Sequence, residues 1–439
     1  DIVVSTFEYD ISSHARSEKP GTSHEASETW FSPAVMPYVR NERIQITKGL
    51  EWCGELQILP TAKRPISGFE AYTGRNSCII PHPKFALESV ASGKYEGTKL
   101  IYTTGCVTER NYIQKKAGQL AQFHHGFGGL LVEVDEEGRW FCRQLNASEG
   151  GTLYDLDVRV SKGKVTTGHR VEAVVWGDAH VRRGDPTVDH LAWGMGDWSM
   201  IDVLQPKYQF FHDLLDFRSR NHHEINSGRK RFERWAAGGA EDSVALELQE
   251  AAKALWLRGR DYTQSVVVNS NHDRALLKWL DTADYRMDPK NALTFLDLQT
   301  WVYRQTYIGA TRPGNPPDNI FEYAMKQHGA PKNVRFLQED ESFIICPDAN
   351  GGIECGMHGD LGVNGGRGSA IGFARMGRKS IVGHGHSTAI VDGVYIVGHS
   401  AQVDLGYNKG PSSWSHSHCV VYPNGKRTII TMWKGKWRA

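Results

Sequence analysis

The chain has 439 residues, of which 40% are hydrophobic and 23% are charged, and its formal net charge is +1. This length allows two or three domains, and the composition is ordinary for a globular protein. A net charge so close to zero excludes binding of nucleic acid through the overall charge of the protein. Any such binding would depend on local basic patches and on metal ions.

The seven cysteines are scattered and include no C-x-x-C pair. Their odd number and spacing argue against a disulfide framework and a zinc ribbon, and they favour a reducing cytoplasm. No apolar run approaches the roughly 20 residues of a membrane helix. The first residues, DIVVSTFEYD, lack the basic start and apolar stretch of a signal peptide. We therefore expect a cytoplasmic protein with no membrane partner.

Residues 1–170 are expected to form an accessory α+β region that serves substrate binding or self-association. The first 40 residues are polar and predict a loosely packed lead-in. Residues 111–123 have the apolar spacing of a helix. Two segments of alternating residues around a turn, 130–145 and 155–168, predict hairpins. No chemical motif is recognisable in this part of the chain.

The pattern changes at residue 171, where the second predicted domain, 171–439, begins. Apolar runs that end in a polar loop occur at 171–180, 208–213, 265–273, 353–360 and 379–386. Helices are predicted at 243–259, 274–283 and 319–329. This alternation predicts an α/β core with functional groups at the carboxyl ends of its strands. Hairpin patterns at 389–400 and 418–433 add an antiparallel part, which gives a layered β-sandwich flanked by helices.

The loops after these apolar runs carry carboxylates, imidazoles and one amide. They contain Asp178, His180, Asp213, Asn271, His272, Asp273, His358, Asp360, His384 and His386. Side chains two residues apart at the end of a strand point to the same side, so each Asp-x-His or His-x-His pair can face one ion. Such a mixed set suits manganese, iron or zinc better than calcium. A shared carboxylate can bridge two ions about 3.5–4 Å apart.

The ordered set D-x-H, D-x-x-D, N-H-D, H and G-H-x-H resembles the calcineurin-like metallophosphoesterase superfamily over about residues 171–400. The resemblance implies a dinuclear centre that hydrolyses phosphoesters by in-line attack of metal-bound hydroxide. It implies that Asp178, His180 and His386 hold the first ion. Asn271, His358 and His384 would hold the second, and Asp213 would bridge both.

The same resemblance gives two further residues a role. It implies that His272 faces the scissile phosphate and stabilises charge or protonates the leaving oxygen, and that Asp273 orients a neighbouring imidazole. The implied cofactors are two divalent ions, with Mn²⁺ preferred and Mg²⁺, Fe²⁺ or Zn²⁺ as alternatives.

The sequence departs from the family pattern at His212, where relatives usually have glycine. A rival to the second motif exists at Gly196–Asp197. We prefer Asp213 because residues 208–211, YQFF, predict a buried strand. His212 itself is expected to be solvated or hydrogen-bonded, and the role of Asp216 stays open.

Three features favour DNA as the substrate. The second motif, HDLLDFRSR, resembles that of double-strand-break repair nucleases, and residues 217–235 carry six basic side chains against two acidic ones. The N-terminal region offers surface for a polymer. Arg218, Arg220 and Arg367 are the candidate phosphate contacts, although a solvated basic face is an equal reading of the charge run.

The loops DAHVRRGD, NSNHDR and CGMHGDLGVNGGRG also resemble the host-DNA-degrading nucleases of T-five-like bacteriophages. That resemblance implies a manganese-dependent DNase that acts on DNA in the cytoplasm of an infected bacterium. Self-association through the N-terminal region is a further expectation. Two alternatives stay open. One is a phosphomonoesterase or cyclic-nucleotide phosphodiesterase, and the other is a non-catalytic metal-binding module. His399, His416 and His418 are expected to be structural.

Overall fold

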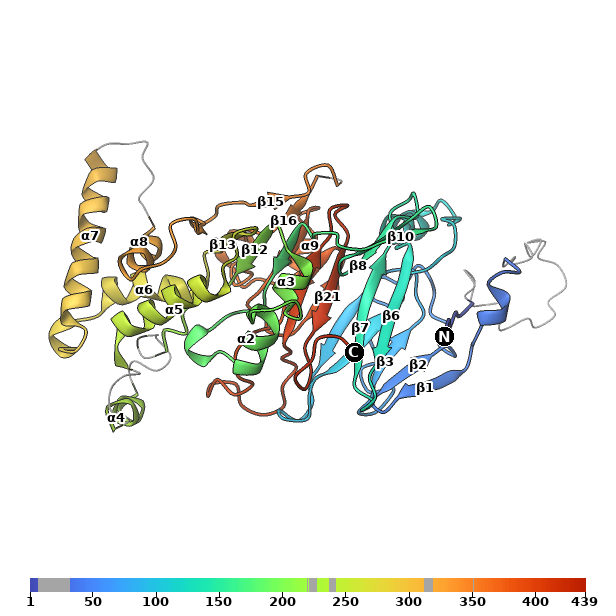
Figure 1. Cartoon of the computed structure of the whole chain (residues 1–439), viewed down its shortest axis with the longest axis horizontal. Helices are drawn as coiled ribbons and strands as arrows, with labels where there is room; N and C mark the ends of the chain where they lie inside the picture. Colours follow the sequence, from blue (N-terminus) through green and yellow to red (C-terminus); the bar gives the residue numbers. More distant parts are fainter. Residues whose placement is uncertain (7–31, 219, 221–226, 237–241, 312–318, 350) are drawn as a thin grey trace.

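The structure is a computed structural model, and it shows an elongated molecule with helices at one end, sheets in the middle and the N-terminal strands at the other end (Figure 1). It describes residues 1–6, 32–218, 220, 227–236, 242–311, 319–349 and 351–439. Most of the predicted N-terminal lead-in lies outside the described residues. No helix in the described part of the chain combines the length and apolarity that crossing a membrane requires.

A six-stranded sheet carries the first three predicted metal loops. Its order is β14 (Arg335–Phe336), β13 (Gln264–Val267), β12 (Tyr208–Phe211), β11 (Ala173–Val175), β20 (Ser417–Val421) and β21 (Arg427–Thr431). The strands β11 to β14 run parallel to one another. The strand β20 runs antiparallel to β11, and β21 runs antiparallel to β20. The parallel strands therefore end at one edge of the sheet, where their loops can meet.

A ten-stranded sheet carries the other two loops. Its order is β1 (Arg43–Thr47), β2 (Leu50–Cys53), β3 (Ser77–Ile80), β5 (Lys99–Thr103), β4 (Leu87–Val90), β18 (Ala389–Val391), β19 (Val394–Ile396), β17 (Lys379–Val382), β16 (Ile353–Glu354) and β15 (Ile344–Ile345). The strands β4 and β18 pair, with Leu87 opposite Ile390. One sheet thus contains strands from both sides of residue 170, and the domain boundary there stays a prediction.

The two sheets pack face to face, and helices cover the outer face of the six-stranded sheet. Alternate residues of β11 divide between two cores, as the period of a strand requires. Val175 packs with Ile353 and Ile381 of the ten-stranded sheet, whereas Val174 faces the helical side. The helices there are α2 (Pro186–Trp193), α3 (Met200–Leu204), α5 (Val244–Arg258), α6 (Asn271–Thr282) and α8 (Ile320–Gln327). The predicted α/β class and layered sandwich are confirmed.

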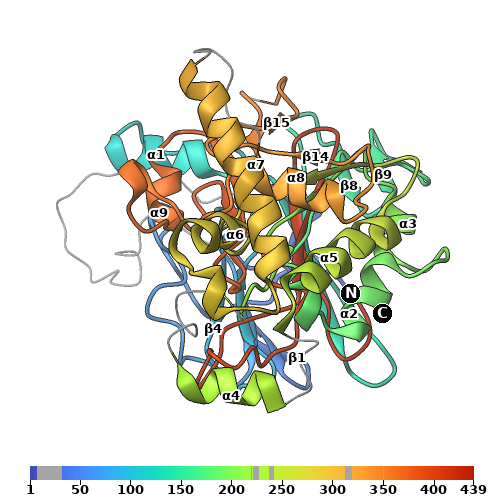
Figure 2. The same cartoon turned by 90° about the vertical axis from the view of Figure 1, so that its left-hand side faces the viewer.

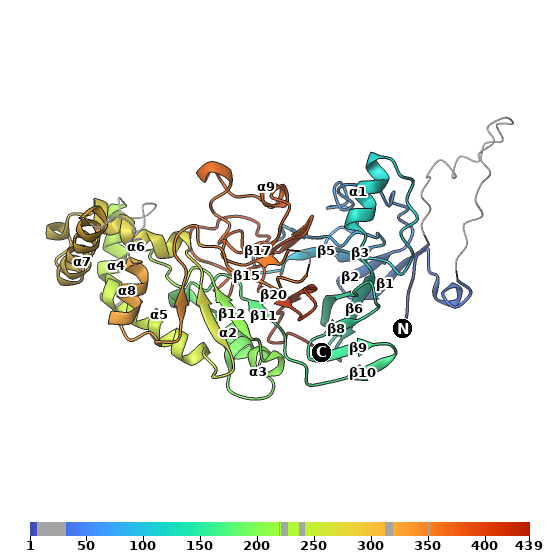
Figure 3. The ribbon, with the colours of Figure 1, turned by 90° about the horizontal axis from the view of Figure 1, so that it is seen from above.

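Most of the elements predicted from local patterns are present. The predicted hairpins are β6 (Gly128–Val134) with β7 (Trp140–Asn146), β9 (Val158–Ser161) with β10 (Lys164–Thr166), β18 with β19, and β20 with β21. The helix expected at 111–123 is the shorter α1 (Lys116–His124). The helix α5 begins after Ser243, whose side chain accepts the Leu246 N–H, and ends at Gly259. Figure 3 shows the strands that carry the metal loops between the helices and the N-terminal strands.

Two helices with a large exposed surface were not predicted. The helix α7 (Ala292–Thr311) stands at one end of the molecule, and α4 (Gly228–Ala236) lies within the basic segment (Figure 2). Both carry exposed aromatic side chains, Tyr303 and Tyr307 on α7 and Phe232 and Trp235 on α4. Their apolar residues do not all face the core, so the spacing rule for core-facing helices does not identify them.

Candidate metal centre

The five predicted loops converge at the carboxyl ends of strands from both sheets. Asp178, Asp213 and Asn271 follow β11, β12 and β13, and the main chains of these loops are bonded to each other. The His180 N–H donates to the Asp213 carbonyl at 2.7 Å. His358 and His384 come after β16 and β17, and the Gly383 N–H donates to the His358 carbonyl at 2.7 Å. The parallel order of the strands brings distant parts of the chain together.

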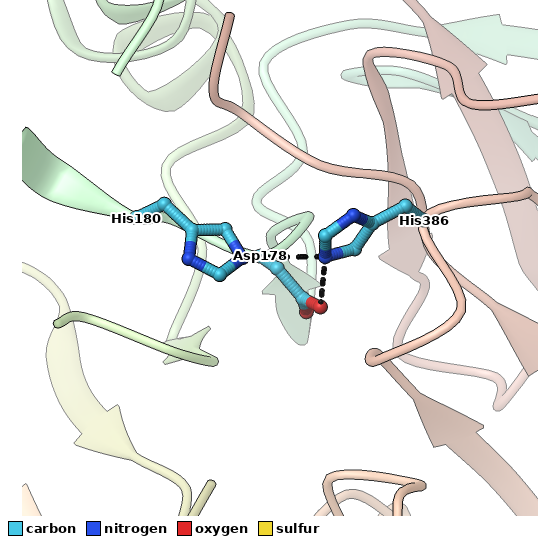
Figure 4. Close-up of side chains that lie close together, drawn as sticks. All are labelled: Asp178, His180 and His386. Atoms are coloured by element: carbon cyan, nitrogen blue, oxygen red, sulfur yellow. Dashed lines mark hydrogen bonds and ion pairs between the residues drawn. The ribbon is translucent and has the colours of Figure 1, made fainter. Parts of the chain in front are cut away.

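The first group of ligands consists of Asp178, His180 and His386 (Figure 4). The His386 Nε2 lies 2.9 Å from the Asp178 Oδ2 and 3.3 Å from the His180 Nε2. All three side chains are buried. One ligand atom of each lies within 4.8 Å of the other two, so these side chains can hold one metal ion.

A second group of donor atoms lies beside the first. The His358 Nε2 is 2.7 Å from the Asn271 Oδ1 and 3.2 Å from the Asp213 Oδ2, and the His384 Nδ1 is 3.2 Å from the same Asn271 oxygen. The Asp213 Oδ2 is also 4.0 Å from the His180 Nε2. Asp213 thus faces both groups. The rival Asp197 is exposed and is in none of the potential metal groups among the described residues.

Several buried polar atoms of the centre have no hydrogen-bond partner among the described residues. They are the Asp178 Oδ1, the His212 Nε2 and the His386 Nδ1. Leaving a buried polar atom without a partner costs about 1–3 kcal/mol, so native structures seldom tolerate several in one place. Carboxylate and imidazole donors suit a transition-metal ion, which could supply partners for some of these atoms. The residues present therefore fit bound metal ions.

Opposite charges dominate the electrostatics of the centre. Burial would raise the pKa of Asp178, but His358 and His386 hold it at about 2. Burial alone would lower the pKa of His358, but Asp213 and Asp178 raise it to about 9. Burial and the neighbouring His272 lower the pKa of His180 to about 3. The centre keeps its carboxylates ionised, which is the form that binds a cation.

The backbone of the loops is unusual. His180, Asp213, His384 and His386 all have positive φ angles, between 37° and 66°. Residues other than glycine adopt this left-handed region rarely, and such strain concentrates at functional sites. Gly383 is required for a different reason: a Cβ there would lie 2.2 Å from the Asp178 Oδ1.

His272 is the second residue of α6, and its ring lies beside the first group. Its Nδ1–H donates to the Asp216 carbonyl at 2.6 Å, which leaves Nε2 as the other functional nitrogen. Its backbone N–H donates to the Asp213 Oδ1 at 3.1 Å. Burial alone would lower the pKa of His272, but Asp213 raises it above its ordinary value. His272 also forms a potential metal group with His180 and Asp213.

Asp273 was expected to orient a neighbouring imidazole, and this role stays a prediction. Its carboxylate accepts the N–H groups of Leu214 and Leu215, at 3.4 and 2.9 Å. Burial and the nearby Asp213 raise its pKa to about 8. Asp273 thereby holds the chain directly after Asp213 in place.

Three residues near the centre were not predicted as part of it. His212 is fully buried, and its Nδ1 lies 3.3 Å from the His358 Nδ1, so it forms a potential metal group with Asp178 and His358. The Asp216 Oδ1 lies 3.6 Å from the His180 Nδ1. His399 is buried against His386, with ring centroids 5.4 Å apart, and neither of its ring nitrogens has a hydrogen bond to the part of the chain that the structure describes. The only sequence signal was that His212 and Asp216 lie within the second motif, HDLLDFRSR.

The predicted substrate contacts differ in their surroundings. Arg220 pairs with Asp288 and Asp242, each at 2.7 Å, and only 8% of its side chain is exposed. These ion pairs argue against a phosphate contact there, which stays a prediction. Arg367 is exposed, on the loop that follows Asp360, and Asp360 itself pairs with Arg274. Arg218 packs against Gly406.

Tyr407 is an aromatic side chain near the centre that was not predicted as part of it. Burial raises its pKa above the ordinary value, and so do the carboxylates of Asp216, Asp213 and Asp178. It is 45% exposed and packs on Trp414, whose ring lies 4.3 Å from that of His386. A partly exposed aromatic ring beside a metal centre can stack on a flat ligand.

The fold and the site together define an α/β protein with a buried histidine–aspartate centre that can hold metal ions. No protein-family model and no solved structure matches the chain. It is similar to Protein A1 of Escherichia phage T5, with 38% identity over 450 residues that cover 100% of this chain and 77% of the relative. The chain belongs to the family of that bacteriophage protein.

Proposed function

We propose that the chain is a metal-dependent deoxyribonuclease of the calcineurin-like metallophosphoesterase type. The observation that carries the proposal is the position of Asp213. Its Oδ2 lies 3.2 Å from the His358 Nε2 and 4.0 Å from the His180 Nε2, between two adjacent ligand groups. A carboxylate that faces two groups is what a dinuclear centre requires of its bridging ligand.

The ligand roles follow from this position. Asp178, His180 and His386 would hold one ion, Asn271, His358 and His384 the other, and Asp213 both. Bound divalent ions would activate a water molecule and neutralise charge on a phosphodiester. The mixed oxygen and nitrogen donors favour Mn²⁺, with Mg²⁺, Fe²⁺ or Zn²⁺ as other candidates.

His272 would act on the leaving group. Its Nδ1–H is held by the Asp216 carbonyl, so the ring orientation is fixed and a proton on Nε2 is free to move. The raised pKa favours the protonated ring in the metal-free protein. A protonated imidazole beside the ligands can stabilise charge on the phosphate or donate a proton to the leaving oxygen.

DNA is the substrate we favour. Arg367 is exposed on a loop after His358, and Tyr407 offers a ring for stacking near the centre. The helix α4 adds the basic side chains Arg229 and Lys230 to this half of the molecule. The relative is a bacteriophage protein, which is compatible with degradation of host DNA in an infected bacterial cell.

The test is incubation of the full chain with supercoiled, linear and single-stranded DNA, read on a gel. We expect degradation with Mn²⁺, none with EDTA, and recovery when Mn²⁺ is restored. Asp178→Asn should be inactive under the same conditions. Faster turnover of para-nitrophenyl phosphate than of DNA would instead select the phosphomonoesterase. Metal binding with no hydrolysis of any phosphoester would select the non-catalytic module.

A further inference from the structure

The outer face of α7 is apolar although it lies on the surface of the molecule. Phe295 and Leu298 point inward and are buried, and Trp301 stacks on Tyr323 of α8 with ring centroids 4.4 Å apart. On the other face Tyr303 and Tyr307 are 69% and 71% exposed. In Figures 1 and 2 the helix stands at one end of the molecule, with its outer side turned away from the sheets.

The exposed residues of α7 follow the spacing of a coiled-coil seam. Steps of three and four residues connect Leu293, Leu296, Thr300, Tyr303, Tyr307 and Ala310, and all six are exposed. In a heptad notation Leu293, Thr300 and Tyr307 occupy a, and the other three occupy d. Helices normally turn such a seam toward a partner, whereas here it faces outward over about five turns.

Two charged side chains border this seam on one side. Asp297 and Arg304 are both exposed, lie seven residues apart and both occupy the heptad position e. Neither makes an ion pair with any of the described residues. Position e faces position e of a partner when two helices run antiparallel, and position g when they run parallel. Position g of α7 is uncharged, with Gln299 and Thr306.

We propose that α7 pairs antiparallel with α7 of a second copy of the chain about a two-fold axis. With Thr300 level with Tyr303 of the second copy, Leu296 is level with its Tyr307 and Leu293 with its Ala310. This register fills every position of the seam, and it places Asp297 within two residues, or about 3 Å along the axis, of Arg304 of the second copy. The two-fold symmetry repeats that ion pair.

The charges select this occupant and this direction. An unrelated partner would have no reason to match a seam with one acid and one base at the same edge, whereas a second copy matches it by symmetry. A parallel pair would place Asp297 opposite uncharged residues and leave Arg304 without a partner. The seam is short and includes a threonine and an alanine, so we expect reversible dimers at micromolar concentration.

The test is a measurement of the molar mass of the full chain by light scattering across a concentration series. We expect self-association that Tyr303→Glu with Tyr307→Glu weakens at least tenfold, because the substitutions place four acidic groups in the seam of a dimer. Leu257→Glu is the matched control, since it replaces an apolar residue of α5 that is 63% exposed outside the seam. The control should associate like the wild type. Unchanged association of the double variant would overturn the proposal.

The direction of pairing has its own test. Asp297→Arg and Arg304→Asp should each weaken association, because each places like charges at both ends of the pair. The double variant Asp297→Arg with Arg304→Asp should restore it, because the ion pairs form with their charges exchanged. Single variants that associate like the wild type, or a double variant no better than the singles, would overturn the antiparallel register. Circular dichroism on each variant controls for loss of the helix.

Discussion

The metal loops and the basic segment 217–235 adjoin one another in sequence, yet they differ in what their side chains meet. The acidic and imidazole side chains of the loops converge, so that Asp213 reaches both His180 and His358. Those basic side chains of the segment that the structure describes have acidic partners of their own. Arg220 is paired with Asp242 and Asp288, and Arg229 pairs with Glu233 within α4.

This difference shows what fixes the role of a charged residue. The order of the strands in the sheet determines where ligands at the strand ends lie. The apolar runs in the sequence predict these strands. A base in a charge run is placed by whichever acid it meets, and Arg220 meets one that lies 68 residues further along the chain. A count of charges therefore says little about which of them face a substrate.

The largest expected effect is at the bridge. Asp213→Ala should lose bound metal, and its rate of DNA hydrolysis should fall by more than about 1,000-fold, beyond the loss of a single stabilising donor. Metal content by mass spectrometry and a plasmid assay measure the two effects. Asp197→Ala, at the exposed rival position, is the control and should match the wild type. Full metal content and activity in Asp213→Ala would remove the dinuclear assignment.

His272→Ala separates catalysis from metal binding. Because the side chain is expected to transfer a proton or stabilise charge, kcat should fall by about 100- to 10,000-fold while both ions stay bound. Metal content and single-turnover rates at saturating Mn²⁺ test this. An unchanged rate would contradict the role in hydrolysis. Loss of metal would instead make His272 a ligand, in its group with His180 and Asp213.

Much of the centre could be predicted because its ligands follow apolar strands in a recognisable order. The direction of single side chains could not. His212 directly precedes Asp213, which has a φ of 45° and turns the chain. At this turn His212 is buried beside His358, and a local pattern does not predict such a position. The hydrogen bonds that Asp273 accepts from backbone N–H groups could not be predicted either, because no motif displays them.

Long-range pairing in the fold was equally invisible in the sequence. The hairpins could be predicted because each is local, and Asp392 and Gly393, both with positive φ, form the turn between β18 and β19. The pairing of β4 with β18 joins residues about 300 positions apart, for example Leu87 and Ile390. Local patterns carry no information about such a partner, so this pairing across residue 170 could not be predicted.

Arg220→Ala tests whether the basic segment is structural at this point. Removing the guanidinium breaks the pairs with Asp242 and Asp288, so the free energy of unfolding should fall by roughly 3 kcal/mol, the low end for buried pairs because both acids are partly exposed. Urea unfolding measures it. Arg229→Ala, on exposed α4, should change stability by less than about 0.5 kcal/mol. Weaker DNA binding by Arg220→Ala at unchanged stability would instead make Arg220 a DNA contact.

The smallest expected effect concerns Glu247, which connects the two regions. Its Oε1 accepts the N–H groups of Asp216 and Phe217, directly after the metal motif, and burial raises its pKa to about 7. A pKa above the unfolded value near 4.5 stabilises the fold at low pH. This contribution is lost as the pH rises through about 7, and it amounts to about 2 kcal/mol between pH 5 and pH 8.

Glu247→Gln keeps an oxygen for both N–H groups but cannot ionise. The variant should therefore lose this part of the pH dependence and gain stability relative to the wild type at pH 8 but not at pH 5. Urea unfolding of both proteins at the two pH values measures the difference, and other titrating groups cancel in it. Parallel pH profiles would show that Glu247 ionises normally. Asp216 and Phe217 would then be held by a carboxylate whose ionisation does not lower the free energy of unfolding.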